Sequence, residues 1–141
     1  MSQGGFNKID ASDAKMYGSR GIILCGYDIS EQEKFAELLI ENGVDNIHLV
    51  SANETHVEQT LGEIVASPDR TGFGTKSTLP RASILSGITE KELHLIISMV
   101  RGSEMPGQLW ASMTPTSETW KLKDLLAELI REREEFRKRK A

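Results

Sequence analysis

One short pattern of residues occurs twice in the chain, and it constrains the fold more than any other feature. Residues 20–26 and 81–87 both begin with Arg, carry Ile-Leu before one variable residue, and end in Gly. Each is followed by Ile-[Ser/Thr]-Glu-x-Glu, at residues 29–33 and 88–92. Since a repeat of this length marks one supersecondary unit that is used twice, the pattern predicts two similar halves.

Each half is expected to run strand, helix, strand, helix. Short apolar runs bounded by turn residues indicate the strands, and capping boxes at Ser30–Glu33 and Thr89–Glu92 indicate two helix starts. Asn53 is expected to cap a further helix whose apolar face includes Val57, and the last helix is expected to face Phe136 inward. The expected strands are 22–25, 47–50, 83–85 and 109–113.

This alternation predicts an α/β fold in which two β-α-β-α repeats share one mostly parallel four-stranded sheet with helices packed on it. Right-handed crossovers and the more apolar first and third strands favour the order 2-1-3-4. The expected parts are a flexible segment at 1–18, repeats at 19–66 and 80–141, and a flexible linker at 67–79. A unit of about 60 residues is marginal alone, so the halves should share one core in one compact domain.

Composition and charge narrow the functional classes. The chain has 141 residues, one cysteine, and no apolar run of membrane-spanning length, which favours a cytoplasmic protein without a membrane partner. Residues 1–130 carry 11 basic and 18 acidic side chains, a net charge of −7, whereas residues 131–141 carry 6 and 3, a net of +3. Because an acidic body repels phosphate backbones, nucleic acid is an unfavoured partner.

A candidate ligand site follows from the expected sheet. In a parallel sheet, the loops after all four strands meet at one edge, where helix N-termini attract anions. A phosphate or carboxylate could bind there, although hydroxyl and amide side chains at such positions more often cap helices and close turns. The candidate ligand-binding residues are Gly26, Asn53, Ser86, Gly87, Thr114, Thr116 and Ser117.

Other chemistry-bearing residues favour structural roles. Cys25 ends a strand without a nearby base, so a buried thiol is favoured over a nucleophile. The three histidines lack metal-ligand spacing, and residues 70–77 lack the glycine spacing of a phosphate-binding loop. No catalytic set, metal site or cofactor is therefore expected.

The two tryptophans and the basic tail also favour structural roles. Trp110 and Trp120 are expected to be buried anchors, and an exposed Trp120 would instead indicate a partner surface. The basic residues 137–140 are expected to complement the C-terminal end of a solvated helix.

The second half resembles a small bacterial and archaeal family of unknown function. The resemblance is carried by Pro80-Arg81 at its start and by the sequence Thr-Pro-Thr-x-x-x-Trp, residues 114–120, near its end. It covers residues 79–135 and implies neither an activity nor catalytic residues. In the first half, residues 51–53 replace Thr-Pro-Thr and no tryptophan matches Trp120.

Three functional hypotheses remain, and the least favoured is nucleic-acid binding through the basic tail at residues 137–140. The leading one is a non-enzymatic cytoplasmic module that binds a protein partner or acts as an accessory or regulatory protein, because no catalytic set converges. The alternative is a small-molecule-binding protein or an enzyme that binds a phosphate or carboxylate with the loop Thr114–Ser117. Neither the partner nor the oligomeric state follows from the sequence.

Overall fold

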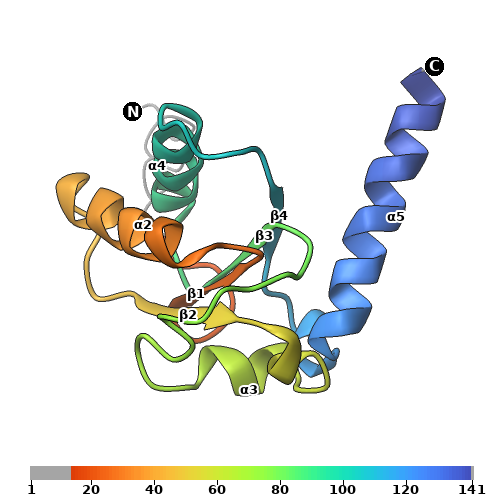
Figure 1. The fold of residues 1–141 in the computed structure, drawn as a ribbon, viewed down its shortest axis with the longest axis horizontal. Helices are drawn as coiled ribbons and strands as arrows, with labels where there is room; N and C mark the ends of the chain where they lie inside the picture. Colours follow the sequence, from red (N-terminus) through yellow and green to blue (C-terminus); the bar gives the residue numbers. More distant parts are fainter. Residues whose placement is uncertain (1–13, 141) are drawn as a thin grey trace, which may run out of the picture.

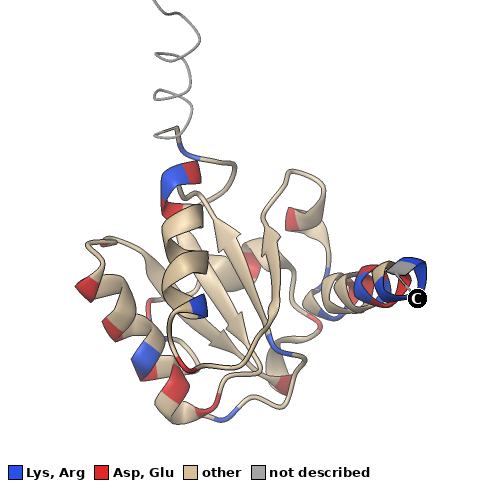
Figure 2. Ribbon diagram, turned by 90° about the horizontal axis from the view of Figure 1, so that it is seen from above, with Lys and Arg blue, Asp and Glu red and all other residues tan. Residues whose placement is uncertain are grey.

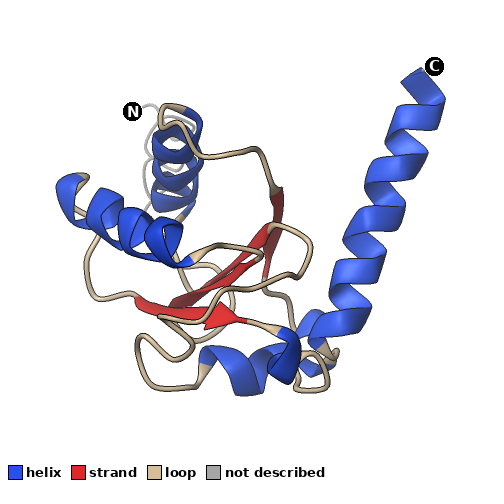
Figure 3. Cartoon of the chain, viewed as in Figure 1, coloured by secondary structure: helices blue, strands red, loops and turns tan. Residues whose placement is uncertain are grey.

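The computed structural model describes residues 14–140 and shows a four-stranded sheet between two layers of helices (Figure 1). Helices α2 and α4 cover one face, while α3 and the start of α5 lie against the other (Figure 3). The strands are β1 Gly21–Cys25, β2 His48–Ala52, β3 Ala82–Ser86 and β4 Leu109–Ser112. The α-helices are α2 Ile29–Glu41, α3 Leu61–Val65, α4 Glu90–Arg101 and α5 Leu122–Lys140, with 3-10 turns η1 Glu54–His56 and η2 Ser117–Thr119.

The sheet has the predicted strand order, but one of its three strand pairs is antiparallel. The order is β2-β1-β3-β4, and β1 pairs with β2, and β3 with β4, in parallel. The central pair, β1 and β3, is antiparallel, with Gly21 opposite Ser86 and Cys25 opposite Ala82. The strands of each half are therefore parallel to one another, and the two halves run in opposite directions. Two of the three strand pairs in the sheet are parallel.

Two apolar clusters hold the layers together. Alternate residues of each strand point to opposite faces, so Ile22 and Leu24 join one cluster while Ile23 and Cys25 join the other. Phe35 and Ile96 bring α2 and α4 into the first cluster. Each buried side chain of this size contributes about 1.5–3 kcal/mol, so the two central strands hold the halves as one body.

The helix starts agree with the prediction in the second half and differ in the first. Thr89 caps α4, and Glu92 completes the predicted capping box. In the first half Asp28, not Ser30, is the cap, and Glu31, not Glu33, completes the box. Asp28 occupies the capping position because its carboxylate accepts hydrogen bonds both from the backbone N–H of Glu31 and from the hydroxyl of Ser30.

The second and last helices also differ in detail from the expected ones. Asn53 caps only the short turn η1, and α3 begins anew with a capping box of Thr60 and Glu63. In α5 the inward residues end near Leu129, and Phe136 is 58% exposed because the helix extends past the body (Figure 1). We call residues 131–140 of α5 the arm.

The segment between the halves, expected as a linker, makes hydrogen bonds to the first half. Gln32 donates from its amide to the Thr75 carbonyl and accepts from the Gly74 N–H. The Ser77 hydroxyl accepts from the Gly26 N–H. The segment therefore packs against the first half instead of only connecting the two.

The expectation for residues 1–18 lies mostly outside the described part of the chain. Within it, the Met16 N–H donates to the Ile88 carbonyl and the Gly87 N–H donates to the Tyr17 carbonyl. Residues 15–17 therefore attach to the second half. Among the described helices, none is long and apolar enough to cross a bilayer.

Candidate protein-interaction surface

The residues predicted to form one ligand site lie at opposite ends of the sheet. Gly26 and Asn53 follow β1 and β2 at one end. Ser86 ends β3, and Gly87 and the loop 114–117 follow β3 and β4, at the other end, because β3 runs antiparallel to β1. The prediction that four loops converge is therefore wrong, because the strands of the second half run opposite to those of the first half.

The loop Thr114–Ser117 closes on itself. The Thr114 N–H donates to the Ser117 hydroxyl, and the Ser117 N–H donates to the Thr114 hydroxyl, at 3.0 and 2.9 Å. The neighbouring Glu118 places a carboxylate beside the loop, where it accepts from the Tyr17 hydroxyl at 2.6 Å. Two of the hydroxyls are thus used as turn caps, next to a negative charge.

At the other end, Arg81, which we expected from the sequence to have a structural role, lies between Tyr27 and Glu31. Its guanidinium stacks 4.2 Å from the ring centre of Tyr27 and donates to the Gly26 carbonyl and to the Glu31 carboxylate, at 3.3 and 2.7 Å. Tyr27 is fully buried, and its hydroxyl bonds to Ser83 and accepts from the Gln108 amide. Burial raises the pKa of Tyr27, so it stays a neutral member of this network.

Arg20 makes the corresponding contacts at the opposite end. It donates to both carboxylate oxygens of Glu92, at 2.8 and 2.6 Å, and to the Gly87 carbonyl at 3.5 Å. Each arginine precedes the first strand of one half and pairs with the capping glutamate of the other half. These crossed ion pairs join the halves at both ends of the antiparallel seam.

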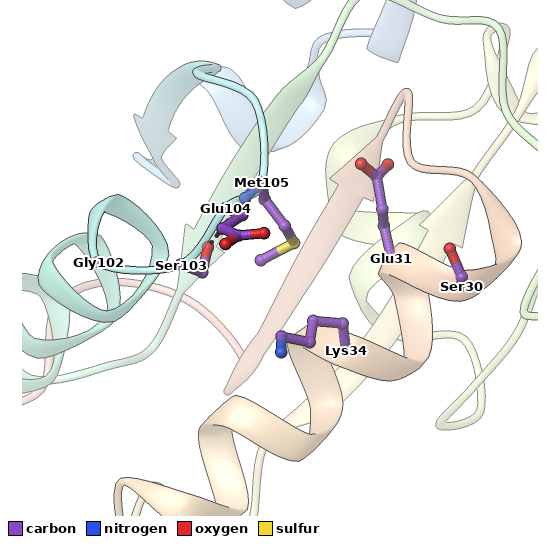
Figure 4. A pocket seen from close by; sticks show the side chains of 7 residues that line it. All are labelled: Ser30, Glu31, Lys34, Gly102, Ser103, Glu104 and Met105. Carbon is purple, nitrogen blue, oxygen red and sulfur yellow. Dashed lines mark hydrogen bonds between the residues drawn. The ribbon is translucent and has the colours of Figure 1, made fainter.

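A groove lies between the start of α2 and the loop that follows α4 (Figure 4). It encloses about 600 Å³ and is lined by Glu31, Lys34, Glu104 and Met105, among others. Glu31 is already bound to Arg81 and to the Asp28 N–H. Glu31 lies on α2 and points away from Lys34, whereas Glu104 lies on the loop after α4, so the two acidic side chains come from different elements (Figure 4).

The residues considered for redox or metal chemistry are placed as structural groups. Cys25 is fully buried, and this burial raises the pKa of its thiol to about 12. His56 is buried and accepts from the Asn53 N–H, so it closes the η1 turn. In the part of the chain that the structure describes, no cluster of His, Cys, Asp and Glu could hold a metal.

One outer edge of the sheet, along β2, is sealed by the segment between the halves. The Arg70 N–H donates to the Leu49 carbonyl at 2.7 Å, and the Ser51 N–H donates to the Thr71 carbonyl at 2.8 Å. Asp69 accepts from the Leu49 N–H with its carboxylate, also at 2.8 Å. The outward backbone groups of β2 are therefore paired within the chain.

The other outer edge, along β4, has no strand paired to it among residues 14–140, and we call it the open edge. The N–H groups of Leu109 and Met113 donate inward to the strand beside them, at 3.0 and 2.8 Å. Because backbone groups alternate along a strand, those of Trp110 and Ser112 point outward. Among residues 14–140, β4 pairs with β3 alone. An unpaired edge of this kind is a template for a strand from another chain.

Helix α5 stands beside this open edge. In two views at right angles it lies beyond β4, on the side of the sheet away from β2 (Figures 1 and 2). Leu129 is partly buried against the sheet, as are Leu109 and Ala111 of β4. An apolar strip between strand and helix therefore remains partly accessible.

Trp120, at the start of α5, is 36% exposed, which differs from the expected burial. Its backbone explains the difference. The Trp120 N–H donates to the Ser117 carbonyl and its own carbonyl accepts from the Leu61 N–H, so the main chain fixes the loop without burying the ring. The indole borders a surface depression with Lys121, Lys123 and Glu128. Trp110 is partly buried against the α2–α4 cluster.

The charge on this side is mixed. Basic and acidic residues alternate along α5, with basic residues at its end (Figure 2). Arg131 bridges Glu128 and Glu135 along the helix, and Arg137 pairs with Glu134. These exposed pairs support the helix by only a few tenths of a kcal/mol each.

Sequence reasoning missed Glu31, Tyr27 and Gln108, which complete the Arg81 network, and the open β4 edge. The alignment of the two similar segments contained evidence for the role of Glu31. Aligning Arg20 with Arg81 without a shift pairs Glu31 with Glu92, whereas the pattern used for prediction paired Glu33 with Glu92. The open edge had no comparable signal, because it depends on which segments lie beside β4 in three dimensions.

Comparisons with known proteins agree with the resemblance seen in the second half. No curated protein and no solved structure matches the chain. The match that is found contains β3, α4, β4 and most of α5, so it includes the open edge. Residues 81–136 match the model of a family described as a domain of unknown function, DUF3783.

Proposed function

We propose that this protein is a non-enzymatic, cytoplasmic accessory module that binds a partner protein, and that the partner adds a β-strand to β4 under α5. The observation that carries the proposal is the contrast between the sealed edge and the open one. Strand addition draws its affinity from main-chain hydrogen bonds and its specificity from neighbouring side chains. Here Trp110 and Leu129 supply apolar contacts next to the free backbone groups.

The architecture of two halves fits this role. We infer that they are copies of one unit, since the Arg–Gly–Glu contacts of one half correspond to those of the other. A sheet built from two such units has two equivalent outer edges. Only the first unit is followed by a segment that covers its edge, which leaves the second unit available for binding.

A proline in the open edge tests the proposal. Ser112 is exposed and its N–H points outward, so Ser112→Pro removes a donor needed by an added strand while the bonds to β3 remain. We expect a protein captured from native lysate by the wild type and by Ser112→Ala to be lost with Ser112→Pro. Equal capture by all three variants would contradict binding at this edge.

The alternative function is a phosphate or carboxylate site that uses the loop Thr114–Ser117. It rests on that loop alone, because the other candidate residues lie at the far end of the sheet or inside it. Substitution of Thr116, described in the Discussion, separates the two hypotheses.

A further inference from the structure

We infer that the strand added to β4 is the β4 of a second copy of this chain, so that two copies form one continuous eight-stranded sheet across a two-fold axis. The inference rests on the proposed function of β4 as a strand-binding edge, and it names the partner. A closed two-fold dimer is the commonest assembly of soluble chains, and it uses the same patch on both copies.

The strand is suited to pair with itself. If the axis passes through Ala111, Trp110 of one copy, whose backbone groups point outward, lies opposite Ser112 of the other, and the reverse pair forms symmetrically. Both residues then form hydrogen-bonded pairs, whereas the two Ala111 residues form the closer, non-hydrogen-bonded pair. The smallest side chain thus lies where the strands approach most closely, and the largest faces a small one.

Helix α5 lies where such a dimer needs a cover. A strand paired to β4 would enter the space beyond that edge, and α5 stands on that side of the molecule (Figures 1 and 2). Leu129 and Ile130 are half-buried, and Phe136, farther along the helix, is 58% exposed. In the dimer each α5 would extend over the partner's sheet and bury this apolar strip, so the arms would be exchanged.

Charge favours a second copy over a nucleic acid as the occupant. Residues 1–130 carry a net charge of −7 and residues 131–141 a net of +3. Two bodies alone would repel each other, but each arm that reaches the other copy brings a positive charge to a negative surface. A phosphate backbone would gain only the arm and would be repelled by the rest of the chain.

The mass of the purified full-length chain in solution tests the inference. We expect light scattering after size exclusion to give twice the chain mass for the wild type and for Ser112→Ala, at concentrations from micromolar upward. Ser112→Pro should give the mass of one chain, with an unchanged circular dichroism spectrum that shows it is folded. A wild type that is monomeric throughout this range, or a Ser112→Pro dimer, would overturn the inference.

A second variant tests the exchange of arms. Phe136→Ser changes an exposed residue, so the fold should persist, and the loss of an anchor at the interface should raise the dimer dissociation constant about tenfold. An unchanged constant would overturn the contribution of the arm. Salt-sensitive binding of a labelled single-stranded oligonucleotide that is lost when Arg137 and Arg139 become Glu would assign the arm to nucleic acid instead.

The two proposals can fail separately. If the wild type is monomeric yet captures a lysate protein that Ser112→Pro does not, strand addition stands and the second copy is wrong as its source. If the wild type is dimeric and Ser112→Pro is dimeric as well, binding at the β4 edge fails for this partner.

Discussion

The two outer strands of the sheet, β2 and β4, have different neighbours because of the segments that come after them in the chain. After α3 the chain turns back along β2, and residues 69–71 pair with its free backbone groups. After β4 the chain continues into α5, which stands beside the edge without pairing to it. The edge of β2 is thereby paired within the chain, whereas among residues 14–140 no segment pairs with the outer edge of β4. If strand addition is the function, as we propose, the segments that follow β2 and β4 decide which edge can bind a partner.

The largest expected effect comes from breaking the seal on β2. Gly72 has φ +83°, and a Cβ there would lie 1.9 Å from the Ser51 carbonyl oxygen, so Gly72→Ala must displace the segment. We expect a loss of about 3 kcal/mol in the free energy of unfolding, measured with urea.

Gly74→Ala is the matched control for this change. Its φ is +90°, but a Cβ there would meet nothing within 4 Å, so only the strain of the left-handed backbone remains. We expect a loss of about 1–2 kcal/mol. Equal losses for the two variants would show that the contact of residue 72 with β2 carries no weight.

The seam between the halves gives a reference that is independent of both edges. The Arg20 guanidinium, together with the Thr89 N–H, lowers the pKa of Glu92 to about 2 in the folded protein, against an ordinary value of 4.5. The ion pair therefore stabilises the fold above about pH 4.5, and this contribution is lost as the pH falls toward 2. With both side chains about one-fifth exposed, we expect it to amount to about 2 kcal/mol.

Glu92→Gln should remove that part of the acid dependence. Chemical unfolding from pH 6 to pH 2 should give a flatter stability profile for the variant than for the wild type. Glu33→Gln is the control, because its pair with Arg70 is about half exposed and should contribute little. Parallel profiles for the wild type and Glu92→Gln would contradict a role for the crossed ion pair in stability.

The smallest effect is expected at the loop after β4. Thr116 is exposed and its hydroxyl makes no hydrogen bond with the described residues, so Thr116→Ala should change stability by less than about 0.5 kcal/mol. Ser117→Ala removes a turn cap and should cost about 1 kcal/mol. If phosphate raises the melting temperature of the wild type but not of Thr116→Ala, the anion-site alternative replaces strand addition.

The elements and their order could be predicted because they follow from local signals. Continuous apolar runs such as Ile22–Cys25 indicate strands buried on both faces, and Thr89 with Glu92 indicates a helix start. The direction of β3 could not be predicted in this way. A strand buried on both faces presents the same apolar surface whichever way it runs, and the segment 66–80 is long enough for either connection.

The candidate site was predictable only in part for the same reason. The pocket hypothesis needed all four loops at one end, and the antiparallel seam separates them. Phe136 follows Leu129 at helical spacing, which predicts an inward side chain, but the body ends before the helix does. The proposed interaction surface depends on which of the described segments lie beside β4, and such an arrangement leaves no periodicity in the sequence.

The reactivity of Cys25 can report how often the central part of the sheet opens. It is the single cysteine of the chain, it lies in a central strand, and its thiol, with a pKa of about 12, is almost never the reactive thiolate while the sheet is closed. A thiol reagent can react with Cys25 only when the central strands of the sheet separate. The rate of this reaction therefore measures how often the central strands separate, without an added label. Fraying at either outer strand would leave that rate unchanged, whereas a partner that stabilises the whole sheet would slow it.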